Sequence, residues 1–347
     1  MDAYSNSKVL TFYHEAQECL DTGLCKPRNA LIYPSRACNQ NCYYCADGDT
    51  NEDLKHRIMN TKLFLSLPQQ VKSLGCEAID LCGGGEPFLH PHIEEFILLA
   101  SEFNLKLGAL TNGTMLYGNL ADLVLKTFSF VRISLDSFNL DTYNKVRRPK
   151  NHNVSLEKVI ENIKYLVSKK KEINSNLIIT IKAAFDKDTI LDLDEFIETG
   201  IVLGVDGIHI KTAKNTDNVI TKERVKNYEF TLNAYKKDNK NHKTQVFGSL
   251  EDSVLETPKC FVSPFHVFID TDGSIRLCCY YQDRQEEHTI GNIHNDSLRN
   301  IWWSEIHKEK IKNIDVSKCS VYDCKFHKYN KVLWDGIIKD QGQWQFT

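Results

Sequence analysis

Three cysteines lie within eight residues of one another near the N-terminus, at Cys38, Cys42 and Cys45. Tetrahedral zinc needs four ligands, which usually come in paired C-x2-C or Cys/His sets. Three thiols on one short loop instead suit a [4Fe–4S] cluster, because such clusters are held by thiolates. This spacing would anchor three of the irons and leave the fourth open to another ligand.

A second set of thiols lies far along the chain. Of the twelve cysteines, five lie in the first 50 residues, none lies between Cys82 and Cys260, and five lie from Cys260 to Cys324. A hairpin signal, Asp270-Thr271-Asp272-Gly273, lies between two apolar runs and would carry Cys278 back toward Cys260. The sequence therefore predicts a closed site of four thiolates, holding zinc or an iron–sulfur cluster. Its predicted ligands are Cys260, Cys278, Cys319 and Cys324, with Cys279 as a replacement for Cys278 and His327 as a weaker candidate.

The other thiols and one histidine pair have simpler interpretations. Cys19, Cys25, Cys76 and Cys82 are expected to be small core residues. His90 and His92, around Pro91, are expected to cap the start of a helix rather than bind a metal.

Short apolar strands alternate with amphipathic helices through the first two thirds of the chain, which predicts a parallel sheet. The predicted strands are Ala30–Tyr33, Ala78–Cys82, Lys106–Leu110, Phe130–Leu135, Leu177–Ala184 and Gly207–Lys211. Helices are predicted near 61–74, 92–103, 117–126, 139–146, 155–171 and 192–203, and a longer one over 221–239. The predicted fold is α/β, a partial (β/α)6 TIM-like barrel with a small C-terminal hairpin and helix domain.

The polar motifs follow successive strands, where the chemistry of such barrels takes place. The cysteine loop follows the first strand, and Gly83-Gly84-Gly85-Glu86-Pro87 follows the second. Thr111-Asn112-Gly113-Thr114 follows the third strand. Ser134 and Asp136 end the fourth, where strand alternation would point both into the barrel mouth. Asp136 could instead cap the next helix. Arg147, after the helix predicted near 139–146, could be a solvated surface residue. Lys211, at the end of the sixth strand, could face the substrate.

The cysteine loop, with Tyr44 before its last thiol, and Gly84-Gly85-Glu86-Pro87 one strand later resemble the signature of radical S-adenosylmethionine (SAM) enzymes. The resemblance implies that the open iron binds SAM, whose reductive cleavage yields a 5′-deoxyadenosyl radical that abstracts a substrate hydrogen. It also implies that the Gly84 and Gly85 backbone binds the SAM amino group, with Glu86 nearby. Ser134 and Asp136 are then expected to contact the SAM ribose and carboxylate, and Arg147 to approach the SAM carboxylate. Tyr44 and Asn112 complete the implied cofactor-binding set.

The region from Cys260 onward resembles the SPASM/twitch auxiliary-cluster domain of the same enzymes, with a Gly-Asn-Ile turn and a tryptophan-containing helix. Cys319 and Cys324 are separated by four residues rather than two, and no cysteine follows Cys324. The resemblance therefore implies one auxiliary [4Fe–4S] cluster rather than the two of a full seven-cysteine domain.

Length and composition bound the remaining possibilities. A chain of 347 residues with 41% hydrophobic content can form one large barrel or two domains. A net charge of −3 indicates neither a nucleic-acid nor a membrane partner, and no apolar run approaches the roughly 20 residues of a membrane span. Without a recognisable signal peptide, a cytoplasmic protein is expected. The expected domains are a helical lead-in over 1–28, a barrel over 29–240, an auxiliary-cluster domain over 245–335 and a tail over 336–347.

The leading hypothesis is a radical SAM enzyme, of oxidoreductase or lyase type, acting on a small polar metabolite such as a sugar or aminocyclitol-like alcohol by oxidation, epimerisation or elimination. It would use a [4Fe–4S] cluster, SAM, one auxiliary [4Fe–4S] cluster and an electron donor such as flavodoxin or ferredoxin. The first alternative is a maturase of a ribosomally made peptide or protein. A non-catalytic zinc-binding interaction protein and an electron carrier are alternatives of a different class. The sequence names no catalytic general base.

Overall fold

The computed structural model describes residues 6–47, 57–214, 216–239, 241, 243–251, 257–279, 284–319, 324 and 326–339. The chain divides into two compact units. The barrel unit comprises residues 32–68 and 79–251, and the second unit comprises residues 1–31, 69–78 and 252–347. Strands β1 (Asn29–Ile32) and β2 (Ala78–Leu81) and helix α2 (Thr61–Leu74) each contribute residues to both units.

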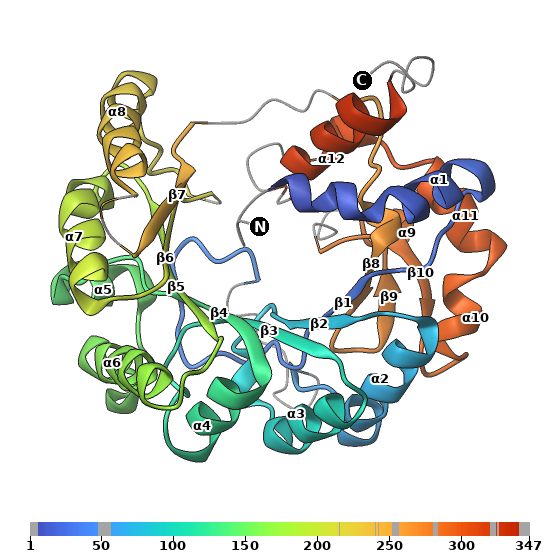
Figure 1. The fold of residues 1–347 in the computed structure, drawn as a ribbon, viewed down its shortest axis with the longest axis horizontal. Helices are drawn as coiled ribbons and strands as arrows, with labels where there is room; N and C mark the ends of the chain where they lie inside the picture. Colours follow the sequence, from blue (N-terminus) through green and yellow to red (C-terminus); the bar gives the residue numbers. More distant parts are fainter. Residues whose placement is uncertain are drawn as a thin grey trace. The chain divides into compact units, whose positions relative to one another are not determined.

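The barrel unit is a sheet of strands that alternate with helices, and the predicted α/β fold is confirmed. Its strands run in the order β2-β3-β4-β5-β6-β7, and each neighbouring pair from β3 to β7 is parallel. Beyond β2, the strands are β3 (Lys106–Thr111), β4 (Phe128–Ser134), β5 (Ile178–Phe185), β6 (Gly207–Thr212) and β7 (Gln245–Ser249). The helices are α3 (Ile93–Glu102), α4 (Gly118–Thr127), α5 (Leu140–Arg147), α6 (Leu156–Glu172), α7 (Leu193–Leu203) and α8 (Lys222–Asp238). Helices α4 to α8 cover the outer face of this curved sheet (Figure 1).

Helix α6 illustrates how the sequence pattern builds this layer. Ser155 caps its first turn by accepting a hydrogen bond from the Lys158 backbone N–H at 3.3 Å. As expected for a helix predicted to be amphipathic, it buries an apolar stripe that includes Val159, Ile163 and Leu166, each 0% exposed. Burying one such side chain contributes about 1.5–3 kcal/mol, so this stripe fixes the helix on the sheet.

Strand β7 was not predicted from the sequence, which gave six strands and placed a domain boundary near residue 240. The strand pairs with β6 in register from Gln245 to Ser249, opposite Gly207 to Lys211. It is an edge strand in which only Val246 is fully buried. Its pattern is therefore too weakly apolar to distinguish it from a loop.

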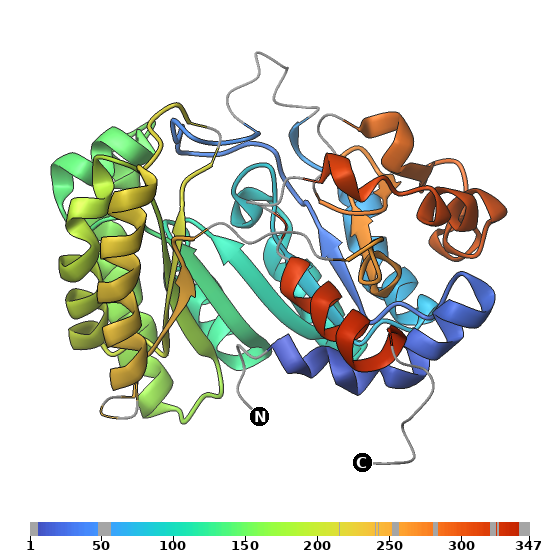
Figure 2. The ribbon, with the colours of Figure 1, turned by 90° about the horizontal axis from the view of Figure 1, so that it is seen from above.

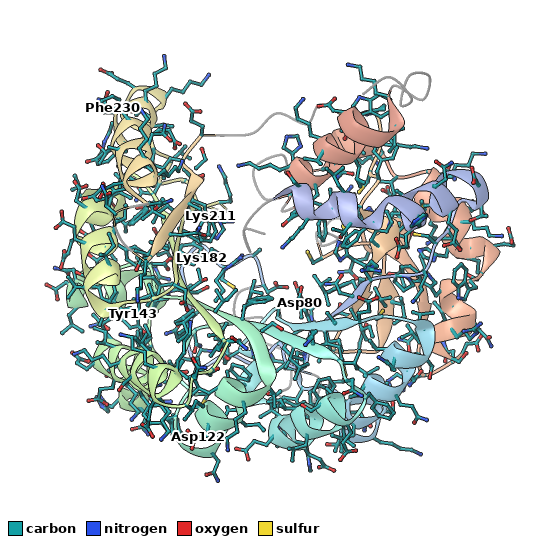
Figure 3. All side chains as sticks on the ribbon, viewed as in Figure 1. Asp80, Asp122, Tyr143, Lys182, Lys211 and Phe230 are labelled. Carbon is teal, nitrogen blue, oxygen red and sulfur yellow. The ribbon has the colours of Figure 1, made fainter. Side chains whose placement is uncertain are left out.

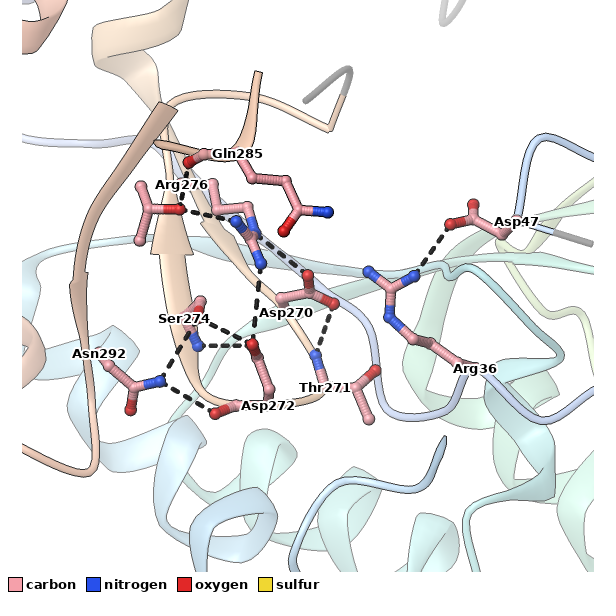
Figure 4. A network of polar contacts seen from close by, with 10 residues as sticks. Arg36, Asp47, Asp270, Thr271, Asp272, Ser274, Arg276, Gln285 and Asn292 are labelled. Atoms are coloured by element: carbon pink, nitrogen blue, oxygen red, sulfur yellow. Dashed lines mark hydrogen bonds and ion pairs between the residues drawn. The ribbon is translucent and has the colours of Figure 1, made fainter. Parts of the chain in front are cut away.

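The second unit contains the predicted hairpin. Strands β8 (His266–Ile269) and β9 (Ser274–Arg276) pair antiparallel, β10 (Thr289–Asn292) pairs with β9, and β8 lies beside β1. Side chains of the turn close the hairpin: Arg276 Nε donates to Asp270 Oδ2 at 3.1 Å, and Ser274 Oγ donates to Asp272 Oδ2 at 2.9 Å (Figure 4). Short helices follow: α9 (Gln285–His288), α10 (Leu298–Trp302), α11 (Glu305–Lys312) and α12 (His327–Leu333).

The N-terminal helices pack against the C-terminal region within this second unit. They are a 3-10 helix, η1 (Asn6–Phe12), followed by α1 (Tyr13–Thr22). Helix η1 packs against α12, and Figure 2 shows the N-terminal helices in blue next to α12 in red. Their shared core contains Val9, Ala16, Phe261, Phe265 and Leu333. Cys25 is buried in this core and Cys19 packs against it, as expected for structural thiols.

The predicted helix capping by the histidine pair is only partly right. His90 is buried and its Nδ1 accepts from the His92 N–H at 3.2 Å, while its Nε2 contacts the Met59 carbonyl at 3.0 Å. His92 is the N-cap residue of α3 but its side chain makes no capping hydrogen bond. Over the described residues, no helix has the length and apolar character required to cross a membrane.

We predict that Gly248→Ala destabilises the barrel unit by detaching β7. Gly248 has φ +110°, and a Cβ there would lie 1.9 Å from the Ile210 carbonyl oxygen of the neighbouring strand. Backbone atoms cannot move away from such a contact, so we expect the free energy of unfolding to fall by about 3 kcal/mol or more. Thermal unfolding would measure it. Gly118→Ala is the control, because its φ is +56° and nothing lies within 4 Å of the new Cβ; equal melting temperatures for the two variants would contradict the prediction.

Candidate functional site

The loop that carries Cys38, Cys42 and Cys45 is held against the end of helix α5. The Asn41 N–H donates to the Arg147 and Arg148 carbonyls at 3.1 Å each, and the Tyr43 N–H donates to the Val146 carbonyl at 3.2 Å. All three thiols are half-buried and none forms a disulfide. Burial raises the pKa of Cys38 to about 11, helped by the charge of Glu86. The backbone of α5 therefore fixes the loop, and the thiols remain available as ligands.

The glycine loop after β2 lies directly on the chain that leads into the cysteine loop. The Gly85 N–H donates to the Ser35 carbonyl at 3.1 Å, and the Glu86 N–H donates to the Ala37 carbonyl at 2.9 Å. A Cβ at Gly85 would lie 2.2 Å from the Ala37 carbonyl oxygen. Glycine is required there because two backbones meet, one residue before Cys38.

Glu86 is buried and holds neighbouring strand ends together. Its carboxylate accepts hydrogen bonds from the Asn112 N–H and the Thr111 hydroxyl, both at 2.7 Å, and from the Phe88 N–H at 3.2 Å. Burial raises its pKa to about 7, although these hydrogen bonds oppose the shift. The carboxylate thus orients the glycine loop through contacts with the protein itself.

Asn112 links the turn after β3 to the cysteine loop. Its Nδ2 donates to Asn39 Oδ1 at 2.7 Å and lies 3.9 Å from the Cys38 sulfur. Asn39 Nδ2 in turn donates to the Thr114 hydroxyl at 2.8 Å. The turn after β3 therefore contacts the loop after β1 at Cys38 and Asn39.

Asp136 and Arg147 are buried and form a group with the half-buried Tyr44 of the cysteine loop. Arg147 Nη2 contacts Asp136 Oδ2 at 2.6 Å, and the Tyr44 hydroxyl donates to the same oxygen. The Ala184 N–H donates to Asp136 Oδ1 at 2.8 Å, and Arg147 Nη1 lies 3.6 Å from the Cys42 sulfur. Three residues predicted to contact a cofactor are thus bonded to one another beside a thiol.

The sequence-based picture of the β4 end needs two corrections. Strand β4 ends at Ser134, and Asp136 has φ +71°, so the alternation that would point both side chains to one face does not reach Asp136. The capping role considered for Asp136 belongs to Asn139, whose side chain accepts from the Thr142 N–H at 3.0 Å.

The alternative considered for Arg147, a solvated surface residue, is also wrong, because Arg147 is only 5% exposed.

The second cysteine set lines one cavity in the second unit. Its wall contains Cys260, Cys278, Cys319, Cys324, Ser263, Leu277, Arg284, His288, Ile314 and Phe326. Cys279 is buried outside that wall. Burial raises the pKa of Cys324 to about 12. Residues 320–323 of the loop between Cys319 and Cys324 lie outside the described residues.

Three polar neighbours of these thiols were missed by the sequence analysis. Asn330 Nδ2 lies 3.7 Å from the Cys260 sulfur, Arg284 Nη1 lies 3.6 Å from the Cys319 sulfur, and His288 Nδ1 lies 3.4 Å from the Cys278 sulfur. The only available signal was the closeness of Arg284 and His288 to Cys278 in the sequence. Hydrogen-bond donors to the sulfurs of a cluster tune its potential, which gives these residues a function to test.

Comparison with known proteins identifies the class to which these two sites belong. Residues 32–197 match the model of the radical SAM superfamily, and residues 260–325 match the SPASM model, described as an iron–sulfur cluster-binding domain. These are domains of cluster-dependent enzymes. The chain belongs to the radical SAM superfamily and carries a SPASM-type auxiliary domain. The cofactors that these domains imply are [4Fe–4S] clusters and SAM.

Individual relatives are more distant. The chain is 29% identical over 139 residues to the UPF0026 protein of Helicobacter pylori J99, covering 38% of this chain and 44% of that protein. It is 27% identical over 159 residues to the GTP 3',8-cyclase of Clostridium perfringens SM101, covering 45% and 47%. The chain thus spans less than half the length of these curated relatives.

The fold also matches solved structures. Streptococcus suis SuiB bound to its precursor peptide SuiA superposes with a TM-score of 0.67 at 15% identity, covering 88% of this chain and 71% of that chain. SuiB bound to S-adenosylmethionine superposes with the same TM-score and identity, covering 93% and 78%. At this level of identity the likeness establishes the fold, including the partial barrel.

The residues of both sites fit the implied cofactors. A loop with three thiols and a cavity with four match the donor sets of an open and a closed cluster. Two buried polar atoms, Gln40 Oε1 within the first loop and Arg147 Nε beside it, make no hydrogen bond within the described part of the chain. Unsatisfied buried groups are expected where a ligand completes a site.

We predict that Gly85→Ala prevents the three-thiol loop from assembling its cluster. The new Cβ would displace Ala37 and hence Cys38. After anaerobic reconstitution, we expect the iron bound at this site and the binding of SAM both to fall at least tenfold. For the iron content, Gly84→Ala is the matched control, because its Cβ would meet the side chains of Asp47, at 3.1 Å, and Arg36, at 3.3 Å, which can move (Figure 4 draws this Arg36–Asp47 ion pair). SAM binding is not compared in this control, since the Gly84 backbone is itself expected to bind SAM. Normal iron content in Gly85→Ala would contradict the role given to this contact.

We further predict that Cys278→Ala and Cys279→Ala differ in iron content. Cys278 lines the four-thiol cavity and Cys279 does not. A reconstituted wild-type chain should hold about eight irons, Cys278→Ala about four, and Cys279→Ala about eight. Iron analysis together with visible absorbance measures this. The reverse pattern would show that Cys279 is the cluster ligand and that Cys278 is not.

Proposed function

We propose that this radical SAM enzyme cleaves SAM reductively and abstracts a hydrogen atom from a small polar metabolite. The observation that carries the proposal is the loop of three thiols that form no disulfide, fixed by backbone hydrogen bonds to α5 and in contact with the glycine loop. When bound, the cluster and SAM supply an electron and a 5′-deoxyadenosyl radical. The protein's part is to hold, orient and shield the reacting groups.

Each side chain of this site has a separate task in the proposal. Cys38, Cys42 and Cys45 hold the cluster, and the Gly84–Gly85 backbone binds the SAM amino group while Glu86 fixes its loop. Ser134 and Asn112 supply polar contacts at neighbouring strand ends. Asp136 holds Arg147 in place, and Tyr44 is fixed by the same carboxylate. The unsatisfied Arg147 Nε and Gln40 Oε1 support a polar ligand beside the loop.

The second set of thiols holds an auxiliary [4Fe–4S] cluster in this proposal, ligated by Cys260, Cys278, Cys319 and Cys324. In a net oxidation, a cluster held by these four cysteines would supply an acceptor for the electron of the substrate radical, whereas in a redox-neutral reaction it would be structural. The reducing equivalents for SAM come from a donor such as flavodoxin or ferredoxin. Reduced thiols and clusters favour the cytoplasm as the site of action.

Two substrate classes remain in view. The small metabolite, of the sugar or aminocyclitol kind, undergoes oxidation, epimerisation or elimination. The second candidate is a ribosomally made peptide, favoured by the fold similarity to SuiB in complex with its precursor peptide. The named relative GTP 3',8-cyclase acts on a small molecule, which supports the first class. The family membership argues against the alternatives of a zinc-binding interaction protein and a simple electron carrier.

We predict that Cys38→Ala, Cys42→Ala and Cys45→Ala each abolish SAM cleavage. Each removes one of only three protein ligands of the open cluster. The measurement is dithionite-dependent formation of 5′-deoxyadenosine after anaerobic reconstitution. Cys19→Ala, which removes a thiol of the second unit's core, is the control and should retain cleavage. Cleavage that persists in any of the three ligand variants, or wild-type protein that binds zinc and no iron, would refute the proposed function.

A further inference from the structure

One face of the barrel sheet carries an unusual concentration of positive charge. Arg132 on β4, Lys182 on β5 and Lys211 on β6 lie on the same face, as the strand registers require. Ser134, two residues after Arg132, pairs with Lys182, and Ala184, two residues after Lys182, pairs with Lys211. All three cations are half-buried. Figure 3 shows Lys182 and Lys211 on the side of the sheet away from helices α4 to α8.

The spacing of the sheet brings these cations within reach of a single ligand. Neighbouring strands lie about 4.8 Å apart and alternate residues of one strand about 7 Å apart, so the Cα atom of Lys182 lies within about 9 Å of those of Arg132 and Lys211. His209 pairs directly with Lys182 and stacks on Phe247 with ring centroids 4.8 Å apart. The face thus offers cations at its centre and an aromatic pair at its edge.

Lys182 is the central member of this group. Within the described residues its ammonium group makes neither a hydrogen bond nor an ion pair. Burial, followed by the charge of Lys211, lowers its pKa to about 7, although Asp136 opposes the shift. A half-buried ammonium without a counter-charge is costly, and a bound anion would remove that cost.

The protein itself supplies little negative charge to this face. Strands β3 to β7 contain no aspartate or glutamate. Figure 3 shows Asp80 of β2 on the same side of the sheet as Lys182, and Asp80 has an interaction of its own. Asp136, just beyond β4, is already engaged by Arg147, Tyr44 and the Ala184 N–H. Arg132 and Lys211 have further interactions of their own. The uncompensated charge is therefore centred on Lys182.

We propose that this face binds an anionic oxygen group of the substrate, a phosphate or a cluster of carboxylates, with Lys182 at its centre and Arg132 and Lys211 beside it. The inference rests on the proposed function and narrows its substrate from a polar metabolite to an anionic one. Phosphates and carboxylates accept several charge-assisted hydrogen bonds at once, which neutral sugars cannot match. The anion would anchor the part of the substrate that does not react, and leave its reacting carbon free to reach the strand ends.

The test is anion binding to the reconstituted, SAM-loaded protein under anaerobic conditions, measured by calorimetry without any turnover. The probes are inorganic tripolyphosphate and citrate, which distinguish phosphate from carboxylate. We expect the wild type to bind at least one of them, Lys182→Met to bind it roughly tenfold more weakly or worse, and Lys182→Arg to recover binding. Lys126→Met, which removes an exposed lysine of α4, is the matched control and should bind as the wild type does.

Each other outcome would overturn the inference. If the wild type binds neither probe, or if Lys182→Met binds the probe as tightly as the wild type does, the proposed anion site is refuted. A parallel loss of SAM binding in Lys182→Met would assign the cations to the SAM carboxylate. Binding of a polyglutamate peptide without binding of either small probe would reassign the face to an acidic peptide. Because these measurements need no SAM cleavage, a failure of the proposed function would appear separately, as wild-type protein that forms no 5′-deoxyadenosine.

Discussion

The buried ion pair between Asp136 and Arg147 joins more of the catalytic unit than any other contact described for it. Asp136 follows β4, Arg147 ends α5, the Ala184 N–H belongs to β5, and Tyr44 and Cys42 lie on the cysteine loop. Removing one partner of such a pair leaves an uncompensated buried charge, which typically costs about 3–5 kcal/mol. The position of Cys42, whose sulfur lies 3.6 Å from Arg147 Nη1, therefore depends on an ion pair between two residues outside the cysteine loop.

Glu86 performs a comparable task on the opposite side of the loop. Its hydrogen bonds to Thr111 and Asn112 connect the glycine loop to the next strand end, and Asn112 continues the connection to Asn39. Parallel strands end at one edge of a sheet, so short polar side chains can bridge from one loop to the next. A radical reaction needs its reactive atoms held within a fraction of an ångström, and this layer of contacts is what such precision requires.

Much of this could be predicted because the signals are local. The six predicted strands, the α6 stripe and the Asp270–Gly273 hairpin follow from periodicity and turn chemistry, and the cysteine spacings indicated two sets of thiols. Strand β7 escaped because Gln245–Ser249 has almost no apolar pattern. The pairing of Asp136 with Arg147 and the polar neighbours Asn330, Arg284 and His288 could not be predicted, since the fold alone brings them to their partners.

The second unit is assembled from three separate stretches of chain, residues 1–31, 69–78 and 252–347. Val9 and Ala16 share a core with Phe326 and Leu333, more than 300 residues later. On the ribosome, helices η1 and α1 emerge before the barrel unit and must wait for residues 326–333 before this core can close. The barrel unit, complete at residue 251, can fold earlier. Maturation therefore has a built-in order: the chain can offer its three-thiol loop to the cluster-assembly machinery before its four-thiol cavity exists.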